Sequence, residues 1–186
     1  MRGHDDVETV GVGAMGAADA TGAGVAGTGA TAVLVSACLL GEPCRYDGAA
    51  KPCAAVQALR ERPDVRLVPV CPEQLGGLHT PRPPSESVAT AQGGRLRVMT
   101  REGADVTAAF ERGAREAVRI ARAQGCAVAI LKAKSPTCGC GPAGVYDGSF
   151  TGRLVAGEGI AARALREAGV RVTDEATFAH EGLPTR

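Results

Sequence analysis

Short apolar segments alternate with amphipathic ones along the chain, and this alternation limits the possible folds more than any other feature of the sequence. Four segments are largely apolar and bounded by Gly, Pro or charged residues, which predicts buried strands at 31–37, 65–71, 126–133 and 170–175. Three segments place apolar side chains at helical spacing, which predicts helices at 53–62, 105–125 and 157–168. Buried strands separated by helices indicate a three-layer, Rossmann-like α/β domain with a mostly parallel sheet.

The remaining segments carry weaker signals. Residues 72–87 are rich in Pro and Gly and are expected to lack regular structure. A short edge strand is expected at 95–99. Gly169 directly follows the last helical stripe and is expected to cap that helix before the final strand.

The domain organisation is expected to be simple. Residues 1–30 are mostly Gly, Ala, Thr and acids and predict a disordered extension, residues 31–176 predict a single domain, and residues 177–186 predict a tail. The extension has neither an apolar run nor the basic start of a signal peptide, so we expect a cytoplasmic protein with no membrane partner.

The charge balance constrains the partners. With 21 Lys and Arg against 20 Asp and Glu, the formal net charge is +1, so the chain has no basic excess with which to hold a nucleic-acid backbone. A small molecule is the expected partner, and the sequence indicates no particular oligomeric state.

Seven cysteines are present, and a reducing cytosol together with an odd count argues against a disulfide framework. Cys53 and Cys126 open a predicted helix and a predicted strand, where a free cysteine usually serves as a small buried apolar residue. The other five lie beside Gly and Pro: Cys38, Cys44, Cys71, Cys138 and Cys140. These five are the candidates for chemistry.

The predicted topology brings several of these thiols to one edge of the sheet. Cys38 follows the first strand, Cys71 ends the second with Glu73 just after it, and Cys138 and Cys140 lie in the loop after a later strand. Ligands in parallel α/β sheets bind outside the carboxyl ends of the strands, where these loops meet. The sequence therefore predicts a metal site at this edge.

The cysteine spacing leaves the kind of site open. There is no C-x2-C pair, and Cys38 and Cys44 form a C-x5-C pair that matches neither a zinc ribbon nor a common ferredoxin. Thiolates from distant loops can still gather a soft metal or an iron–sulfur cluster. From spacing alone, zinc, an iron–sulfur cluster and a bare reactive thiol all remain possible.

Two polar side chains near the cysteines are candidates for catalysis. Glu73, at the mouth of a partly dehydrated pocket, could act as a general acid or base, or could simply cap a helix or turn. Ser135 could orient a substrate, or could serve only to form a turn. Lys132 and Lys134 could attract anionic sulfur species, or could lie on a solvated face.

The tripeptide Tyr-Asp-Gly occurs twice, and it contains the only two tyrosines of the chain, Tyr46 and Tyr146. Asp-Gly is a turn signal, so two turns explain the Asp and Gly. Each tyrosine follows a predicted ligand loop and could stack against a flat substrate.

Three blocks of sequence resemble the thiouracil desulfidase family of small bacterial proteins. They are LVSACLLGEPCRYDG, VPVCPEQLGGLHTPRPPSE and LKAKSPTCGCG, and the similarity runs from about residue 33 to about residue 175. The resemblance implies a [4Fe-4S] cluster held by three cysteines, with one iron free to take sulfur from a thiolated nucleobase. The implied activity is non-redox desulfuration of a base such as 2-thiouracil, which gives uracil and sulfide.

Carried over by motif, the resemblance implies roles for particular residues. The implied cluster ligands are Cys38, Cys44 and Cys138, and the implied catalytic residues are Glu73 and Ser135. Two further thiols lie in the same blocks: Cys71 is expected to lie behind the ligands, and Cys140 could compete with them. The alternatives are a non-catalytic thiolate module that binds metal or carries sulfur, and a small-molecule-binding domain with inert cysteines.

Overall fold

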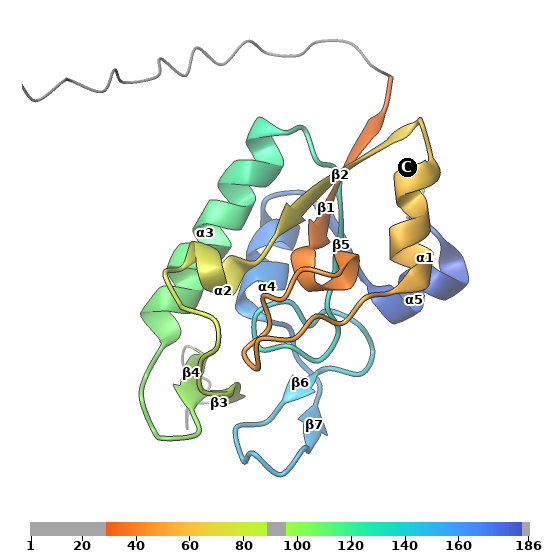
Figure 1. Ribbon diagram of the computed structural model, residues 1–186. Coiled ribbons are helices and arrows are strands. Elements are labelled where there is room, and N and C mark those ends of the chain that lie inside the picture. The colour runs from red at the N-terminus through yellow and green to blue at the C-terminus, as the bar shows by residue number, and fades with distance from the viewer. Residues whose placement is uncertain (1–28, 89–95, 184–186) are drawn as a thin grey trace, which may run out of the picture.

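A central sheet of four strands organises the chain (Figure 1). The computed structural model describes residues 29–88 and 96–183. The strands of the sheet are β1 (Thr31–Ser36), β2 (Val65–Val70), β5 (Val128–Leu131) and β8 (Arg171–Asp174). Their order is β2-β1-β5-β8 and every neighbouring pair is parallel, so the predicted α/β architecture is confirmed.

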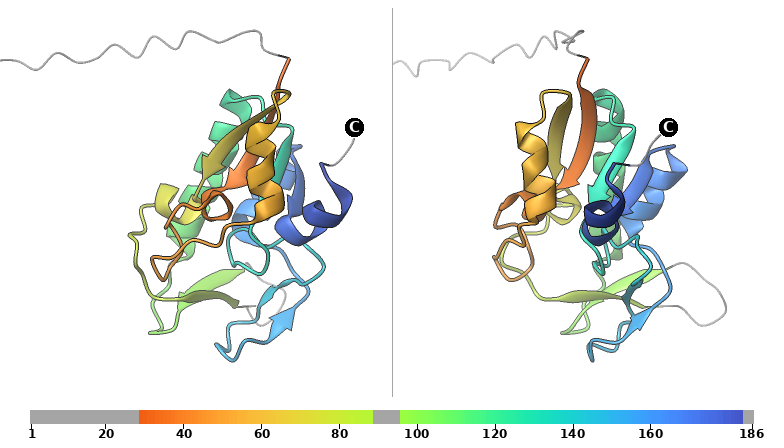
Figure 2. Two further views of the ribbon diagram at one scale, coloured as in Figure 1. Left: turned by 45° about the vertical axis from the view of Figure 1, so that its right-hand side comes forward. Right: turned by 90° about the vertical axis from the view of Figure 1, so that its right-hand side faces the viewer.

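Helices cover both faces of this sheet (Figure 2). One face carries α3 (Thr107–Ala123) and α4 (Ile160–Glu167). The other carries α1 (Ala54–Gln57) with the 3-10 turn η2 (Ala58–Glu61), and α5 (Glu175–Glu181). These are the three layers that the alternating pattern predicts.

The strand β1 shows why its sequence is apolar throughout. Leu34 packs into the core under α3 and α4, while Val33 and Val35 pack into the core under α1 and α5. All three side chains are fully buried. Successive side chains of a strand point to opposite faces, so a strand covered on both sides needs apolar residues at every position.

Two glycines let a short helix approach α3 closely. The helix α2 (Pro72–Leu75) follows β2 and carries Glu73. A Cβ atom at Gly113 of α3 would lie 1.8 Å from the carbonyl oxygen of Pro72, and one at Gly76 would lie 2.1 Å from the carbonyl oxygen of Ala109. Only glycine fits at either position. The close contact therefore determines how near α2 lies to α3.

The expectation for residues 72–87 was partly wrong. The segment contains α2 and the strand β3 (Ser85–Val88), which pairs antiparallel with β4 (Arg97–Thr100). The edge strand expected at 95–99 therefore exists, but it belongs to a separate two-stranded sheet. Pro72 is favourable at the first position of a helix, and the polar β3 lacks the apolar pattern of a core strand.

The sequence predicts an N-terminal extension and a C-terminal tail, and the structure describes most of the tail. Residues 177–181, expected to begin a tail, belong to α5, where the Asp174 side chain accepts a hydrogen bond from Thr177 N at 2.7 Å and Phe178 is buried. The predicted extension at 1–30 lies almost wholly outside the described residues. Within the described part of the chain, no helix is long and apolar enough to cross a membrane.

A hairpin not expected from the sequence completes the fold. The strands β6 (Val145–Tyr146) and β7 (Leu154–Val155) pair antiparallel. The hairpin lies beside β3 at the carboxyl end of the main sheet (Figures 1 and 2). Two-residue strands carry too little periodicity to be recognised from sequence.

Candidate active site

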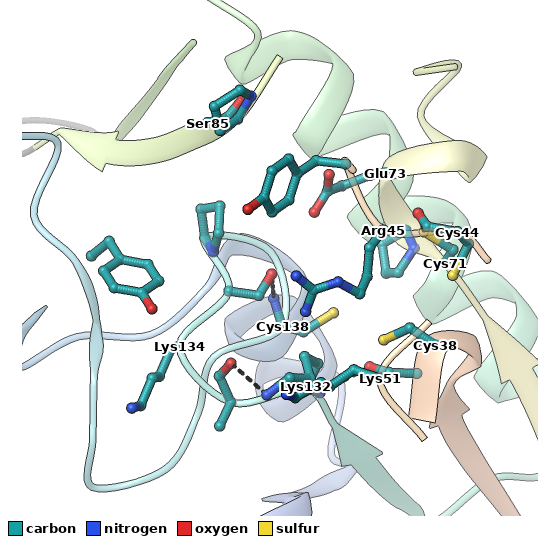
Figure 3. Close-up of a pocket in the computed structure, with 18 of the residues that line it drawn as sticks. Cys38, Cys44, Arg45, Lys51, Cys71, Glu73, Ser85, Lys132, Lys134 and Cys138 are labelled. Atoms are coloured by element: carbon teal, nitrogen blue, oxygen red, sulfur yellow. Dashed lines mark hydrogen bonds between the residues drawn. The ribbon is translucent and has the colours of Figure 1, made fainter. Parts of the chain in front are cut away.

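A cavity of about 700 Å³ opens at the carboxyl edge of the main sheet. Its lining comes from the loops after β1, β2 and β5, as predicted, and also from β3 and the β6–β7 hairpin. Figure 3 shows thiols from separate loops around it. The structure thus brings together the five residues to which the resemblance gives roles: Cys38, Cys44, Glu73, Ser135 and Cys138.

The loop after β1 supplies two of the thiols. Cys38 lies in the 3-10 turn η1 (Ala37–Leu40), directly after β1, and Gly41 ends that turn with a φ of +103°. The chain then turns back, so that Cys44 also faces the cavity. Both cysteines are buried, with 7% and 4% of their surface exposed.

Cys138 is positioned by Ser135. The Ser135 hydroxyl oxygen accepts hydrogen bonds from Thr137 N at 3.1 Å and Cys138 N at 3.2 Å. Ser135 therefore forms the turn considered at the sequence level, and it also lines the cavity. The thiols of Cys138 and Cys38 point toward one another across the cavity (Figure 3).

Cys71 adds a fourth thiol to the cavity wall. It precedes α2, and its thiol donates a hydrogen bond of 3.6 Å to the carbonyl oxygen of Cys44. Contact with the Cys44 thiol, followed by burial, raises the pKa of Cys71 far above its ordinary value. Cys71 thus lies against Cys44.

Cys44 and Cys138, which also line the cavity, likewise have raised pKa values. Hydrogen bonding between the Cys44 and Cys38 thiols is the largest cause that raises the pKa of Cys44 to about 11, and burial raises the pKa of Cys138. The protein alone therefore disfavours thiolates here. A bound metal would reverse this preference, because its charge stabilises the deprotonated thiols.

The remaining cysteines do not line this cavity. Cys140 packs against the core under α3 and α4, and burial raises its pKa to about 12. Cys126 is buried in the same core, as expected for a small apolar residue, and Cys53 packs against the opposite core. All seven cysteines are free thiols.

Glu73 is held in the cavity by two partners. Its Oε2 accepts a hydrogen bond of 2.7 Å from Arg82 Nε, and Arg82 also forms an ion pair with this oxygen. Its Oε1 accepts a hydrogen bond of 2.8 Å from Thr137 Oγ1. The Arg82 side chain is only 8% exposed and Thr137 is fully buried, so the carboxylate is fixed in direction.

The two lysines of the later loop have different surroundings. Lys132 lines the cavity and forms an ion pair with Glu175, whose other oxygen accepts a hydrogen bond from Ala133 N at 2.7 Å. Lys134 also lines the cavity, but its ammonium group points away from the cysteines (Figure 3). The charge of Lys132 is therefore partly neutralised by Glu175.

The donor set suits an iron–sulfur cluster. Within 29–88 and 96–183, no three His, Cys, Asp or Glu side chains are grouped closely enough to bind one metal ion. Cluster ligands bind different iron atoms and so need not converge on one point. Buried thiols from separate loops around one cavity are the soft donors that such a cluster requires.

Comparison with known proteins identifies the family. The sequence model described as 2-thiouracil desulfurase matches residues 33–177. The chain belongs to this family. The matched range includes every residue of the site discussed above, and the resemblance of the three sequence blocks is thereby confirmed.

Individual relatives of the 2-thiouracil desulfurase family agree with this assignment. A solved structure of the [4Fe-4S]-dependent thiouracil desulfidase TudS is similar at a TM-score of 0.70 and 41% identity, covering 81% of this chain and 94% of that one. The uncharacterised protein YbbK of Bacillus subtilis (strain 168) is 38% identical over 148 residues, which are 77% of this chain and 95% of that protein.

Sequence reasoning missed the two residues that hold Glu73. Arg82 and Thr137 hold Glu73, but they attracted no attention because Arg82 lies in a proline-rich stretch and Thr137 is a small residue inside a turn. The available signal was their place within the same blocks as Glu73 and Cys138.

Proposed function

We propose that the chain is an iron–sulfur-dependent desulfidase acting on a thiolated nucleobase such as 2-thiouracil. The reaction is a hydrolysis in which a C–O bond forms between water and the ring carbon, the C–S bond breaks, and sulfur leaves as hydrogen sulfide. Uracil is the other product, and no electrons are gained or lost. The observation that supports this proposal is the single cavity in which the cysteines of the family blocks meet Glu73 and Ser135.

Cys38, Cys44 and Cys138 are the proposed ligands of a [4Fe-4S] cluster, because the family blocks imply these three and all of them line one cavity. When bound, a cluster with only three protein ligands supplies an iron atom that can accept the substrate sulfur as a Lewis acid. Cys71 lies against Cys44 and is proposed as a neighbour of the ligands rather than a ligand itself.

Glu73 is the proposed general acid and base. Its carboxylate takes a proton from the attacking water and returns it to the leaving sulfur. Arg82 and Thr137 each bind one of its oxygens, which leaves further lone pairs directed to the cavity and prevents rotation of the group. This fixed orientation favours an enzyme over a non-catalytic metal-binding or sulfur-carrier domain, in which Glu73 would have no task.

Ser135 is the proposed substrate-positioning hydroxyl. Its oxygen already accepts two backbone hydrogen bonds, from Thr137 and Cys138. Its single proton is therefore available to donate to a carbonyl or ring nitrogen of the base. The same hydroxyl thus links the position of the substrate to that of Cys138.

The proposed partner is a small thiolated base, and the proposed location is the cytoplasm. The seven free cysteines suit a reducing compartment, where thiols persist. The single domain proposed at 31–176 would carry the whole site, since every cavity residue lies between Ser36 and Ala176.

Anaerobic reconstitution with iron and sulfide, followed by a sulfide-release assay on 2-thiouracil, tests the proposal. The wild type should take up a cluster and release sulfide and uracil in equal amounts. Glu73→Gln should retain the cluster and lose release by at least about 100-fold. Glu42→Gln is the matched control, because Glu42 is exposed and does not line the cavity.

The outcomes separate the candidate functions. Release that persists in Glu73→Gln would remove Glu73 from the mechanism. A cluster without release in the wild type would contradict a thiouracil substrate, and a protein that binds zinc but no cluster would favour the metal-binding domain.

A further inference from the structure

Glu86 is a buried carboxylate to which the proposed reaction gives no task. It lies in β3, is 9% exposed, and lines the cavity. Removing a carboxylate from water is unfavourable unless hydrogen bonds compensate it. The hydrogen-bond partners of Glu86 therefore indicate its role.

The carboxylate of Glu86 holds the loop between β6 and β7. Its Oε2 accepts hydrogen bonds from Gly148 N at 3.0 Å and from Phe150 N at 2.9 Å. Hydrogen bonds to a charged acceptor are stronger than those between neutral groups. One side chain of β3 therefore fixes two backbone groups of a loop more than 60 residues further along the chain.

The loop adopts a conformation that needs such support. Phe150 has a φ of +56°, in the left-handed region that a bulky L-residue rarely occupies, and Gly148 has a φ of +87°. Left-handed backbone is costly for a residue with a side chain and persists only when its surroundings enforce it. The hydrogen bond from Phe150 N to Glu86 acts at the strained residue itself.

The loop also packs directly against β3. A Cβ atom at Gly148 would lie 2.7 Å from Val88 Cγ2 and 3.0 Å from the carbonyl oxygen of Ser87. The glycine thus permits the close approach that brings two amides onto Glu86. The β6–β7 loop and β3 therefore form one continuous surface, next to the contact between β3 and β6 (Figure 1).

This surface is the aromatic wall of the cavity. Tyr146 and Phe150 both line the cavity, and the Arg101 guanidinium lies 5.6 Å from the centre of the Phe150 ring. Because Phe150 belongs to the strained loop, the position of its ring depends on the backbone that Glu86 holds. A flat heteroaromatic ring is the class of ligand that aromatic side chains favour by stacking.

We propose that Glu86 is a positioning residue that fixes the aromatic wall formed by Tyr146 and Phe150, and thereby sets the affinity of the site for a flat heteroaromatic ring. It takes no part in the bond-breaking steps. The identity of the ring as a thiolated base rests on the proposed function, whereas the hydrogen bonds from Glu86 to the loop do not.

The test compares Glu86→Ala, Glu86→Gln and the control Glu102→Gln, whose parent side chain is exposed on the turn after β4. In the sulfide-release assay, Glu86→Ala should raise KM for 2-thiouracil about tenfold and change kcat less than about threefold, because only ring binding is weakened. Glu86→Gln keeps an acceptor oxygen and should restore most of the affinity. The control should match the wild type.

Hydrogen exchange gives a second readout that does not depend on turnover. In Glu86→Ala the amides of Gly148 and Phe150 should exchange at least about tenfold faster than in the wild type, while amides in β1 and β5 should not change. Gly148→Ala disturbs the same wall without altering the carboxylate, and it should raise KM in the same way. It also serves as the second variant if Glu86→Ala does not fold.

Two results would overturn the proposal: unchanged exchange and KM in Glu86→Ala, or a large loss of kcat at unchanged KM, which would give Glu86 a direct part in the chemistry. Failure of the proposed function is distinguishable from both. If the wild type releases no sulfide, the exchange rates and the calorimetric Kd for uracil replace the kinetic constants. Weaker uracil binding and faster exchange in Glu86→Ala would then support the role of Glu86, and their absence would refute it.

Discussion

Arg82 joins Glu73 to the loop that carries Cys44. Its Nε donates to Glu73 Oε2 at 2.7 Å, and one of its terminal nitrogens donates to the Cys44 carbonyl oxygen at 3.0 Å. Another nitrogen donates to His79 O at 3.1 Å and to Thr80 Oγ1 at 2.9 Å. A single, nearly buried guanidinium therefore fixes the distance between the proposed acid and base and the proposed ligand loop.

Replacing Arg82 with Lys should lower kcat for sulfide release by about 100-fold while the iron content stays near that of the wild type. Lysine keeps the charge but cannot bind Glu73, Cys44 and His79 at once, and a small displacement of a catalytic group is costly. Steady-state kinetics on the reconstituted enzyme provides the measurement. Arg97→Lys is the control, because the Arg97–Asp105 pair is exposed. A normal kcat in Arg82→Lys would show that Glu73 needs no such support.

Separate alanine variants of the cysteines should divide into two groups. Loss of Cys38, Cys44 or Cys138 should abolish the visible absorbance and most of the bound iron after anaerobic reconstitution, because these are the proposed ligands. Loss of Cys71 or Cys140 should leave both nearly unchanged. Cys140 packs against the core instead of lining the cavity, and Cys71 bonds to the Cys44 carbonyl.

Cys126→Ala controls for the general effect of removing a buried thiol, since Cys126 lies in the core away from the cavity. Iron loss in Cys71→Ala as large as in Cys38→Ala would make Cys71 a ligand. If Cys140→Ala loses its iron and Cys138→Ala keeps it, the ligand in this loop is Cys140 and not Cys138.

The layers and the sheet edge where the cysteines gather could be predicted from local sequence pattern, whereas the roles of individual site residues were implied only by the resemblance of the three sequence blocks. An apolar residue at every position, as in β1, predicts a strand buried on both faces. A parallel sheet of such strands then predicts that Cys38, Cys71 and Cys138 lie at one edge. The partners of Glu73 and the role of Glu86 were not predictable in this way. The contacts of Thr137 with Glu73 and of Phe150 with Glu86 each join residues 64 positions apart, and Arg82 reaches Glu73 across an irregular proline-rich stretch, so no periodic pattern encodes them.

The stability of the cluster-free chain should depend on Asp47 in a defined pH range. The hydrogen bonds from Arg45 are the largest cause that lowers the pKa of Asp47 to about 2 from an ordinary value of 3.8. A lowered folded-state pKa adds stability above 3.8 that is lost as the pH falls toward 2. Because this pair is partly exposed, we expect only about 0.5 kcal/mol.

Urea unfolding of the wild type and Asp47→Asn at several pH values measures this contribution. The difference in free energy of unfolding between the two proteins should be greatest near neutral pH and shrink as Asp47 becomes protonated. Asp64→Asn is a useful comparison, because its partner Arg62 is also two residues away but the pair lies outside the cavity. A difference that stays constant with pH would mean that Asp47 acts through the turn at Ala49 rather than through its charge.

Gly113→Ala should destabilise the protein, although the same change in an exposed helix interior stabilises it by about 1 kcal/mol. The added Cβ would lie 1.8 Å from the Pro72 carbonyl oxygen and 2.7 Å from its carbon, so α2 must move away from α3. We expect a loss of about 2–3 kcal/mol in urea unfolding, as for other overpacked contacts. Sulfide release should fall as well, because α2 carries Glu73.

Ala108→Gly separates the effect of crowding from that of helix propensity. Ala108 is exposed in the first turn of the same helix, so its replacement should cost less than about 1 kcal/mol and leave sulfide release intact. If Gly113→Ala proves as stable as the wild type, the contact between α2 and α3 can relax without cost. If it is destabilised but keeps full activity, the position of Glu73 is set by Arg82 and Thr137 alone, and the glycine contact serves only the fold.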